Sequence, residues 1–149
     1  RARLASGGII RWRAAARFAR RIVEAFDVRT PGVTHAAKAL SGGNLQKFVI
    51  GREILQRPEV LVVNQPTWGV DAAAATAIRA ALIHLAAEGT GVVVISQDLD
   101  ELMEISHRFA ALVGGRLSAP RATEGLSIEK IGLMMGGGQA EEARAHVPA

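Results

Sequence analysis

The sequence predicts an α/β fold in which a helical part precedes a largely parallel sheet. Two short runs rich in valine, 60–63 and 92–95, have the composition of strands buried on both faces. The alanine-rich segment between them, 72–87, is long enough for a helix. Strands that alternate with helices in this way form right-handed βαβ crossovers. A chain of 149 residues, 49% hydrophobic and 21% charged, is sufficient for a folded domain with its own core.

Two helices are predicted before the first strand. Between 11 and 26, apolar residues recur at three- and four-residue spacing and most arginines lie elsewhere, as in an amphipathic helix. The segment 27–31 ends this helix, because the residue before a proline rarely continues one. Ser41, followed by a glycine pair, is a candidate N-cap for the second helix, which stops before Pro58.

Three further elements are predicted after the second strand. They are a short helix over 98–106, a third strand over 109–113 turned by two glycines, and a helix over 127–135. The residues after this last helix are expected to form a loose tail. We therefore divide the chain into a helical part (1–57), an α/β lobe (58–120) and a C-terminal helix with a flexible tail (121–149).

Basic residues are concentrated at the start of the chain. Residues 1–40 hold nine Lys/Arg and two acids, a net +7, whereas the remainder holds nine and twelve, a net −3. Such a segment suits nucleic acid, an anionic membrane surface or an acidic partner, and equally a solvated helix face. No apolar run approaches the ~20 residues of a membrane-spanning helix. The absence of cysteine excludes disulfides and thiolate metal sites.

The most specific stretch of the sequence is 40–47, Leu-Ser-Gly-Gly-Asn-Leu-Gln-Lys. A glycine pair at a helix start lets backbone amides approach an anion, and the helix N-terminus adds its positive end. On its own this pattern favours a simple capped turn. However, polar residues follow both predicted strands, Asn64 and Gln65 after the first and Gln97 after the second. The carboxyl ends of parallel strands are where α/β folds bind ligands.

Three motifs in this order resemble those of ATP-binding cassette (ABC) proteins. The run 40–47 resembles the signature motif, 61–71 resembles the Walker B strand with the following turn and D-loop, and 95–101 resembles the switch-loop region. The resemblance covers residues 11 to 117. It implies part of the P-loop NTPase fold of ABC ATPases, namely the helical signature subdomain and a parallel-sheet lobe.

The details of the signature narrow the resemblance. The form with Asn44, Gln46 and Lys47 is most similar to the second cassette of fused importers for ribose-like sugars and nucleosides. No G-x-x-x-x-G-K-[ST] phosphate-binding loop is found in the chain. Because the family places this Walker A loop N-terminal to the signature, and the chain starts without Met, we expect a missing N-terminal half.

The reacting positions depart from the family pattern. ABC ATPases end the Walker B strand with an aspartate that helps to hold Mg²⁺ and a glutamate that polarises the attacking water; Asn64 and Gln65 align with them. An amide cannot accept a proton as a carboxylate does, and losing a general base costs on the order of 10²–10⁴ in rate. Gln97 replaces the switch-loop histidine. These replacements predict a degenerate half-site.

The resemblance leaves one role intact. In cassette dimers, the signature of one unit closes over nucleotide held by the Walker A loop of the other. ATP and Mg²⁺ would therefore be shared with a partner cassette, and the isolated chain is expected to bind neither and to be inactive. Asp71, in the D-loop, would lie at the dimer interface. The residues expected to bind nucleotide in trans are Ser41, Gly42, Gly43, Asn44 and Gln46.

The resemblance also implies partners and a location. The partners are a cassette fused N-terminally, a membrane permease and, through it, a periplasmic or extracellular solute-binding protein. The location is the cytoplasmic face of the cell membrane, and no nucleic-acid partner is expected. One alternative is a non-catalytic regulatory or scaffold fragment that pairs with another cassette. A nucleic-acid-repair ABC ATPase would suit the arginine-rich start, but the zinc-ligand cysteines and long heptad arms of several such families are missing.

Overall fold

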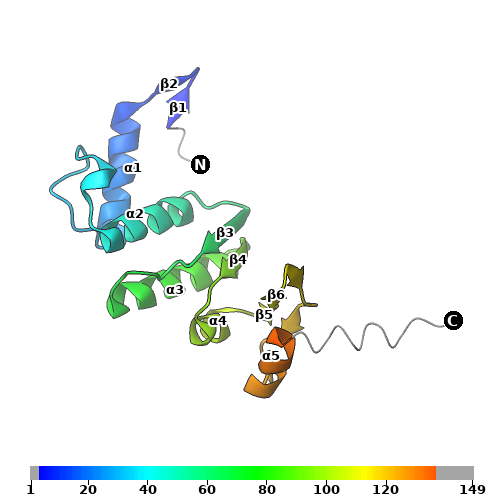
Figure 1. Cartoon of the computed structure of the whole chain (residues 1–149). Helices are drawn as coiled ribbons and strands as arrows, with labels where there is room; N and C mark the ends of the chain where they lie inside the picture. Colours follow the sequence, from blue (N-terminus) through cyan, green and yellow to red (C-terminus); the bar gives the residue numbers. More distant parts are fainter. Residues whose placement is uncertain (1–3, 137–149) are drawn as a thin grey trace. The chain divides into compact units, whose positions relative to one another are not determined.

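The structure is a computed structural model that describes residues 4–136 of the chain. These residues form two compact units, one ending at Asp98 and the other beginning at Leu99 (Figure 1). The signature-like, Walker B-like and D-loop-like residues, and Gln97, all lie in the first unit. The three-part division of the chain made from the sequence remains a prediction.

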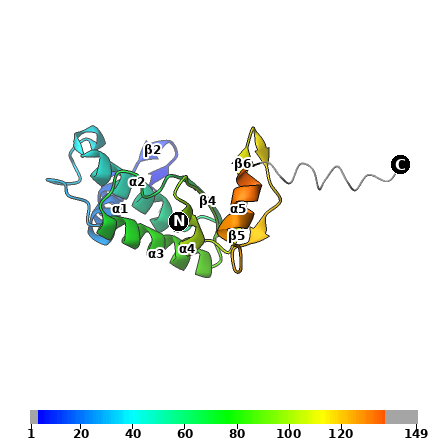
Figure 2. The same cartoon turned by 60° about the horizontal axis from the view of Figure 1, so that its bottom comes forward.

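The helical part of the first unit is built as the sequence predicts. Phe18 and Ile22, one turn apart on the first helix, are both buried, as expected for an amphipathic helix. Figure 2 shows the second helix, α2 (Gly42–Leu55), side by side with α1 (Trp12–Ala25) and with α3 (Ala72–Ala87). The elements are β1 (Ala5–Ser6), β2 (Ile9–Ile10), α1 (Trp12–Ala25), the short 3₁₀ helix η1 (Ala37–Ala39) and α2 (Gly42–Leu55).

The expected βαβ unit is also present. It consists of β3 (Val60–Asn64), α3 (Ala72–Ala87) and β4 (Gly91–Ile95). The two strands pair in parallel, with Asn64 opposite Ile95 at their carboxyl ends. The bounds of α3 are those expected from the alanine-rich segment, and Asp71 caps it by accepting a hydrogen bond from the Ala74 amide at 2.9 Å.

The prediction that both strands are buried on both faces is wrong. On one face, Leu61 and Val63 of β3 are buried, whereas the alternate residues of both strands are open to solvent. Within the first unit, the helices cover only one side of this two-stranded sheet, although parallel sheets normally have both faces covered. The bare face carries Val60, 65% exposed, Val62, 60%, Val93, 50%, and Ile95, 52%.

The second unit confirms two predicted helices but not the third strand. The short helix and the C-terminal helix are present, and Ser127 caps the latter by accepting from the Lys130 amide at 3.3 Å. The predicted strand 109–113 is instead divided between two short antiparallel pairs, β5 with β8 and β6 with β7. The elements are α4 (Leu99–Ile105), β5 (Arg108–Phe109), β6 (Leu112–Val113), β7 (Arg116–Leu117), β8 (Arg121–Ala122) and α5 (Ile128–Met135).

The division of this strand has a local cause. The Ala111 amide donates to the Ser118 hydroxyl at 3.0 Å, and the Ser118 amide donates to the Ala111 carbonyl at 2.8 Å. These bonds, with the predicted glycine turn at Gly114 and Gly115, hold the segment in a hairpin whose strands pair with each other. The predicted tail lies outside the described residues beyond Gly136. No helix among residues 4–136 has the length and apolar character needed to cross a bilayer.

Candidate functional site

The N-terminus of α2 is open to solvent and capped by Ser41. The Ser41 hydroxyl accepts a hydrogen bond from the Asn44 side-chain amide at 2.9 Å and lies 3.5 Å from the Asn44 backbone nitrogen. Ser41 and Gly42 are exposed, and the first turn of the helix carries no acidic residue. The free first-turn amides and the positive end of the helix dipole make this terminus suitable for an anion.

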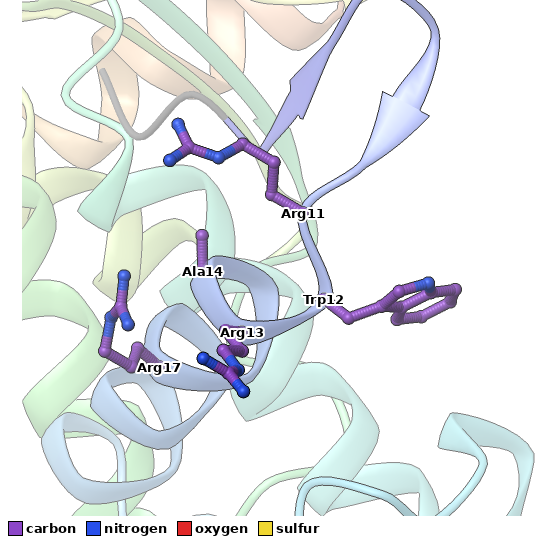
Figure 3. A pocket seen from close by; sticks show the side chains of 5 residues that line it. All are labelled: Arg11, Trp12, Arg13, Ala14 and Arg17. Carbon is purple, nitrogen blue, oxygen red and sulfur yellow. The ribbon is translucent and has the colours of Figure 1, made fainter.

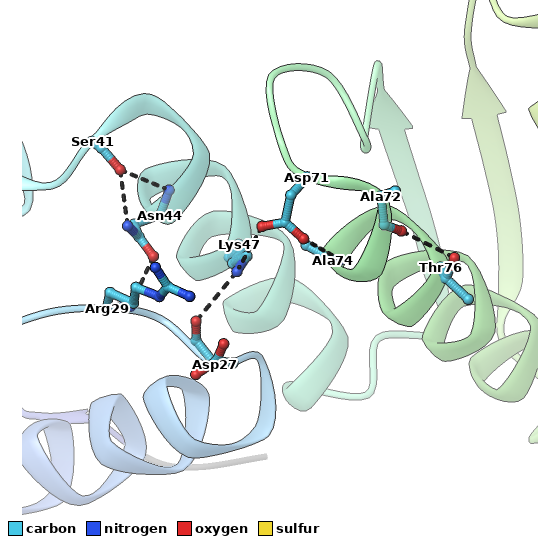
Figure 4. A network of polar contacts seen from close by, with 9 residues as sticks. All are labelled: Asp27, Arg29, Ser41, Asn44, Lys47, Asp71, Ala72, Ala74 and Thr76. Atoms are coloured by element: carbon cyan, nitrogen blue, oxygen red, sulfur yellow. Dashed lines mark hydrogen bonds and ion pairs between the residues drawn. The ribbon is translucent and has the colours of Figure 1, made fainter.

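Asn44 connects this terminus to the segment that follows α1. Its side-chain oxygen accepts a hydrogen bond from the Arg29 backbone amide at 2.8 Å, while its side-chain nitrogen donates to Ser41 (Figure 4). Both polar atoms of the Asn44 side chain therefore have partners within the chain. The structure thus assigns Asn44 a positioning role that its place in the motif did not indicate.

The carboxyl end of β3 is held by backbone contacts. Gln65 has a left-handed backbone with φ of 50°, a conformation that costs a non-glycine residue roughly 1–2 kcal/mol. Its amide donates to the Ile95 carbonyl of the neighbouring strand at 2.8 Å. The Gln46 side chain donates to the carbonyls of Gln65 and Pro66 at 3.0 and 3.1 Å. These bonds stabilise the strained turn and attach it to α2.

A close backbone approach brings the start of α2 against the same turn. A Cβ atom on Gly43 would lie 2.9 Å from the Gly69 carbonyl oxygen, closer than real Cβ contacts allow. Gly69 itself has φ of 72°, in the left-handed region that favours glycine. Glycine at 43 is therefore required by packing, in addition to any approach of a ligand to its amide.

A buried lysine connects α2 to the other end of the turn. Lys47 is 7% exposed, and its ammonium lies 3.4 Å from the Asp27 carbonyl and 3.5 Å from the Asp71 carboxylate (Figure 4). The hydrogen bond from the Ala74 amide, and secondly the charge of Lys47, lower the pKa of Asp71 below its usual value. Adjacent residues of α2, Gln46 and Lys47, thus hold the beginning and the end of the 65–71 turn.

The strand ends carry amides where a metal site would need carboxylates. Asn64 ends β3 opposite Ile95, and Gln97 follows β4 two residues later, so both lie at the carboxyl edge of the sheet. Mg²⁺ is bound in proteins chiefly through carboxylates and phosphates. The neutral donors Asn64, Gln65 and Gln97 therefore do not fit a resident Mg²⁺. No cluster of three or more His, Cys, Asp or Glu residues suited to a metal ion occurs within residues 4–136.

The structure brings the sequence-predicted residues into two neighbouring groups. Ser41, Gly42, Gly43, Asn44 and Gln46 lie on the first two turns of α2, and Asn64 and Gln65 lie at the strand end that Gln46 contacts. The Lys47 contacts were missed. Lysine is seldom buried, so the sequence gives no signal for the burial of Lys47. The Asp27 and Arg29 contacts use backbone atoms and leave no signal in the sequence.

Several known proteins are similar to this chain in sequence. No protein-family model matches the chain. It is 49% identical to a glucose import ATP-binding protein of Haloferax volcanii over 80% of this chain and 22% of that protein. It is 41% identical to a nucleoside import ATP-binding protein of Lactococcus lactis over 83% of this chain and 24% of that protein. The chain thus spans about a quarter of the length of these curated relatives.

Solved structures agree on the fold. The ATP-binding cassette MJ0796, in a dimeric post-hydrolysis state bound to ADP and Pi, matches with a TM-score of 0.67 and 22% identity over 81% of this chain and 52% of that one. An ATP-binding subunit of an ABC transporter matches with a TM-score of 0.66 and 21% identity over 79% and 48%. The fold and the helix terminus beside the strand-end turn define part of an ABC ATPase cassette.

The sequence relatives make the assignment narrower. The relatives that the chain matches, at 38–49% identity, are import ATP-binding proteins for sugars and nucleosides.

Proposed function

We propose that the chain is the signature-bearing part of the ATPase subunit of an importer for a simple sugar or a nucleoside. One observation carries this proposal: the exposed, serine-capped terminus of α2 is held against a strand end that carries the amides Asn64 and Gln65 in place of carboxylates. The relatives named for glucose, nucleoside and guanosine import support the substrate class. In this proposal the chain helps to bind ATP, and the residues that catalyse its hydrolysis belong to another cassette.

The terminus of α2 would act on nucleotide held by a partner cassette. ATP, when bound there, supplies the γ-phosphate that is hydrolysed. The Ser41 hydroxyl can donate to a phosphate oxygen, and the amides of Gly42 and Gly43 add donors that stay in place because the turn fixes α2. Asp71, at the far end of that turn, would lie at the interface between cassettes.

The half-site of the chain itself would be inactive. Gln65 cannot accept a proton from water, and Asn64 and Gln97 bring no charge to hold Mg²⁺ or to stabilise the attacking group. We therefore propose one competent composite site, completed by this signature, and one degenerate site at Asn64, Gln65 and Gln97. Mg²⁺ would be bound on the partner cassette with its nucleotide.

The bare face of the β3–β4 sheet supports a larger assembly. Its exposed valines and isoleucine need a covering layer, since parallel sheets are covered on both faces. We propose that a portion of cassette bearing the phosphate-binding loop covers it, fused N-terminally to this chain. The assembled subunit would dock on a membrane permease served by a solute-binding protein, at the cytoplasmic face of the membrane.

Two substitutions in the assembled transporter test this proposal. Ser41→Arg places a bulky cation at the phosphate-facing terminus and should abolish solute-stimulated ATPase activity. Gln65→Glu restores a carboxylate only at the degenerate half-site and should leave that activity largely unchanged. Unchanged hydrolysis in Ser41→Arg would refute the composite site and would favour a regulatory or scaffold role for this chain.

A further inference from the structure

A basic and aromatic surface at the start of α1 has no role in the proposed function. Arg11, Trp12, Arg13, Ala14 and Arg17 line one hollow on the surface (Figure 3). Arg20 continues the row of arginines one turn further along the same helix face. We refer to Arg11, Arg13, Arg17 and Arg20, together with Trp12, as the arginine–tryptophan surface.

The charge of this surface is not neutralised within the described part of the chain. Its arginines make no ion pair with any residue of 4–136. Glu24, the one acidic residue of α1, lies one turn after Arg20 but makes no ion pair with it, and it is eleven residues, roughly 16 Å along the helix axis, from Arg13. All four arginines are exposed to solvent.

Apolar side chains accompany these arginines. Trp12 is 75% exposed, and Ile9 and Ile10 in the preceding hairpin are 74% and 50% exposed. Successive strand residues point to opposite faces, so neither face of this hairpin is covered. The Arg11 amide donates to the Leu4 carbonyl at 2.8 Å, which attaches the hairpin to the start of α1.

We propose that the arginine–tryptophan surface and the β1–β2 hairpin bind an anionic lipid bilayer surface. Arginines would contact the headgroup phosphates, while Trp12, Ile9 and Ile10 enter the boundary with the acyl chains. Arg13, Arg17 and Arg20 lie along one helix face, which lets α1 rest parallel to the bilayer. Nucleic acid would satisfy the arginines but would give aliphatic isoleucines on a hairpin nothing to stack on.

Vesicle binding by the whole 149-residue chain tests this surface. The chain should sediment with vesicles of phosphatidylglycerol and phosphatidylcholine in equal parts, but not with phosphatidylcholine alone. In a Trp68→Phe background, Trp12 is the single tryptophan, and its emission should shift to the blue on the anionic vesicles. Because each arginine near an anionic surface contributes about fivefold, Arg13→Gln, Arg17→Gln and Arg20→Gln together should weaken partitioning on the order of 100-fold.

A matched variant distinguishes the effect of this surface on vesicle binding from the effect of net charge alone. Arg108→Gln, Arg116→Gln and Arg121→Gln together remove the same charge from exposed positions of the second unit and should change partitioning only severalfold. Circular dichroism would establish that both variants remain folded. Equal losses in the two variants, an unshifted Trp12 emission, or binding to a labelled oligonucleotide but not to vesicles would each overturn the proposal. These outcomes do not depend on the ATPase result, because the vesicle assay needs no nucleotide or permease.

Discussion

Replacing Gly43 by alanine should destabilise the chain, whereas the same change at its neighbour Gly42 should not. A Cβ at 43 would lie 2.9 Å from the Gly69 carbonyl, and one at 42 has no atom within 4 Å. Overpacking of this kind costs about 1–3 kcal/mol. Alanine recovers up to about 1 kcal/mol of helix propensity, and less than that so close to the helix start. The expected net loss for Gly43→Ala is therefore about 1–2 kcal/mol.

Urea unfolding followed by circular dichroism measures this difference. With a dependence of about 2 kcal/mol per molar urea, the midpoint of Gly43→Ala should fall by about 0.5–1 M. Gly42→Ala should stay within the error of the parent chain and serves as the matched control. Equal midpoints for the two variants would show that α2 does not approach Gly69 as closely as described, and the account of the turn would have to be abandoned.

Two further predictions concern the supports of the site. Gly51→Ala would place a Cβ 2.5 Å from the Phe26 ring and should lower the unfolding midpoint. Because Phe26→Leu makes room for this Cβ, the double variant should be more stable than the sum of the two single losses predicts. Strictly additive losses of stability would argue against this contact. The lowered pKa of Asp71 implies stability that is present above its unfolded value of about 3.9 and is lost as pH falls through the folded value. The parent chain should therefore lose more stability than Asp71→Asn between about pH 5 and pH 3 in urea titrations at fixed ionic strength; parallel curves would contradict this.

Local patterns were sufficient for most of the fold. Helix periodicity, caps and breakers gave α1, α2, α3 and α5 because each depends on neighbouring residues, as at Ser127 and Asp71. The bare face of β3 and β4 could not be predicted, because a β-branched run has the same composition whether one face or both are covered. The division of 109–113 depends on the Ala111–Ser118 bonds, which join residues seven apart.

The site shows a similar limit. Motif order located Ser41, Asn64, Gln65 and Gln97, and the structure places Asn64, Gln65 and Gln97 at one edge of the sheet. How α2 is attached to that edge was not predictable, since the acceptors of Gln46 and one acceptor of Lys47 are backbone carbonyls. Any residue at those positions supplies the same carbonyl, so side-chain identity carries no information about the contact.

The same fact supports the proposal that the half-site of this chain is degenerate while its signature is intact. The Gln46 side chain contacts the backbone carbonyls of Gln65 and Pro66, not the Gln65 side chain. The backbone amide of Gln65 donates a hydrogen bond to the Ile95 carbonyl. Exchanging a catalytic carboxylate at 65 for an amide therefore removes the chemistry of that position without releasing α2 from the turn. Lys47 and Asp71 secure the other end by contacts that also bypass residue 65. Because positioning runs through the backbone and catalysis through the side chain, the two can be lost separately, as the pairing of Ser41→Arg with Gln65→Glu is designed to reveal.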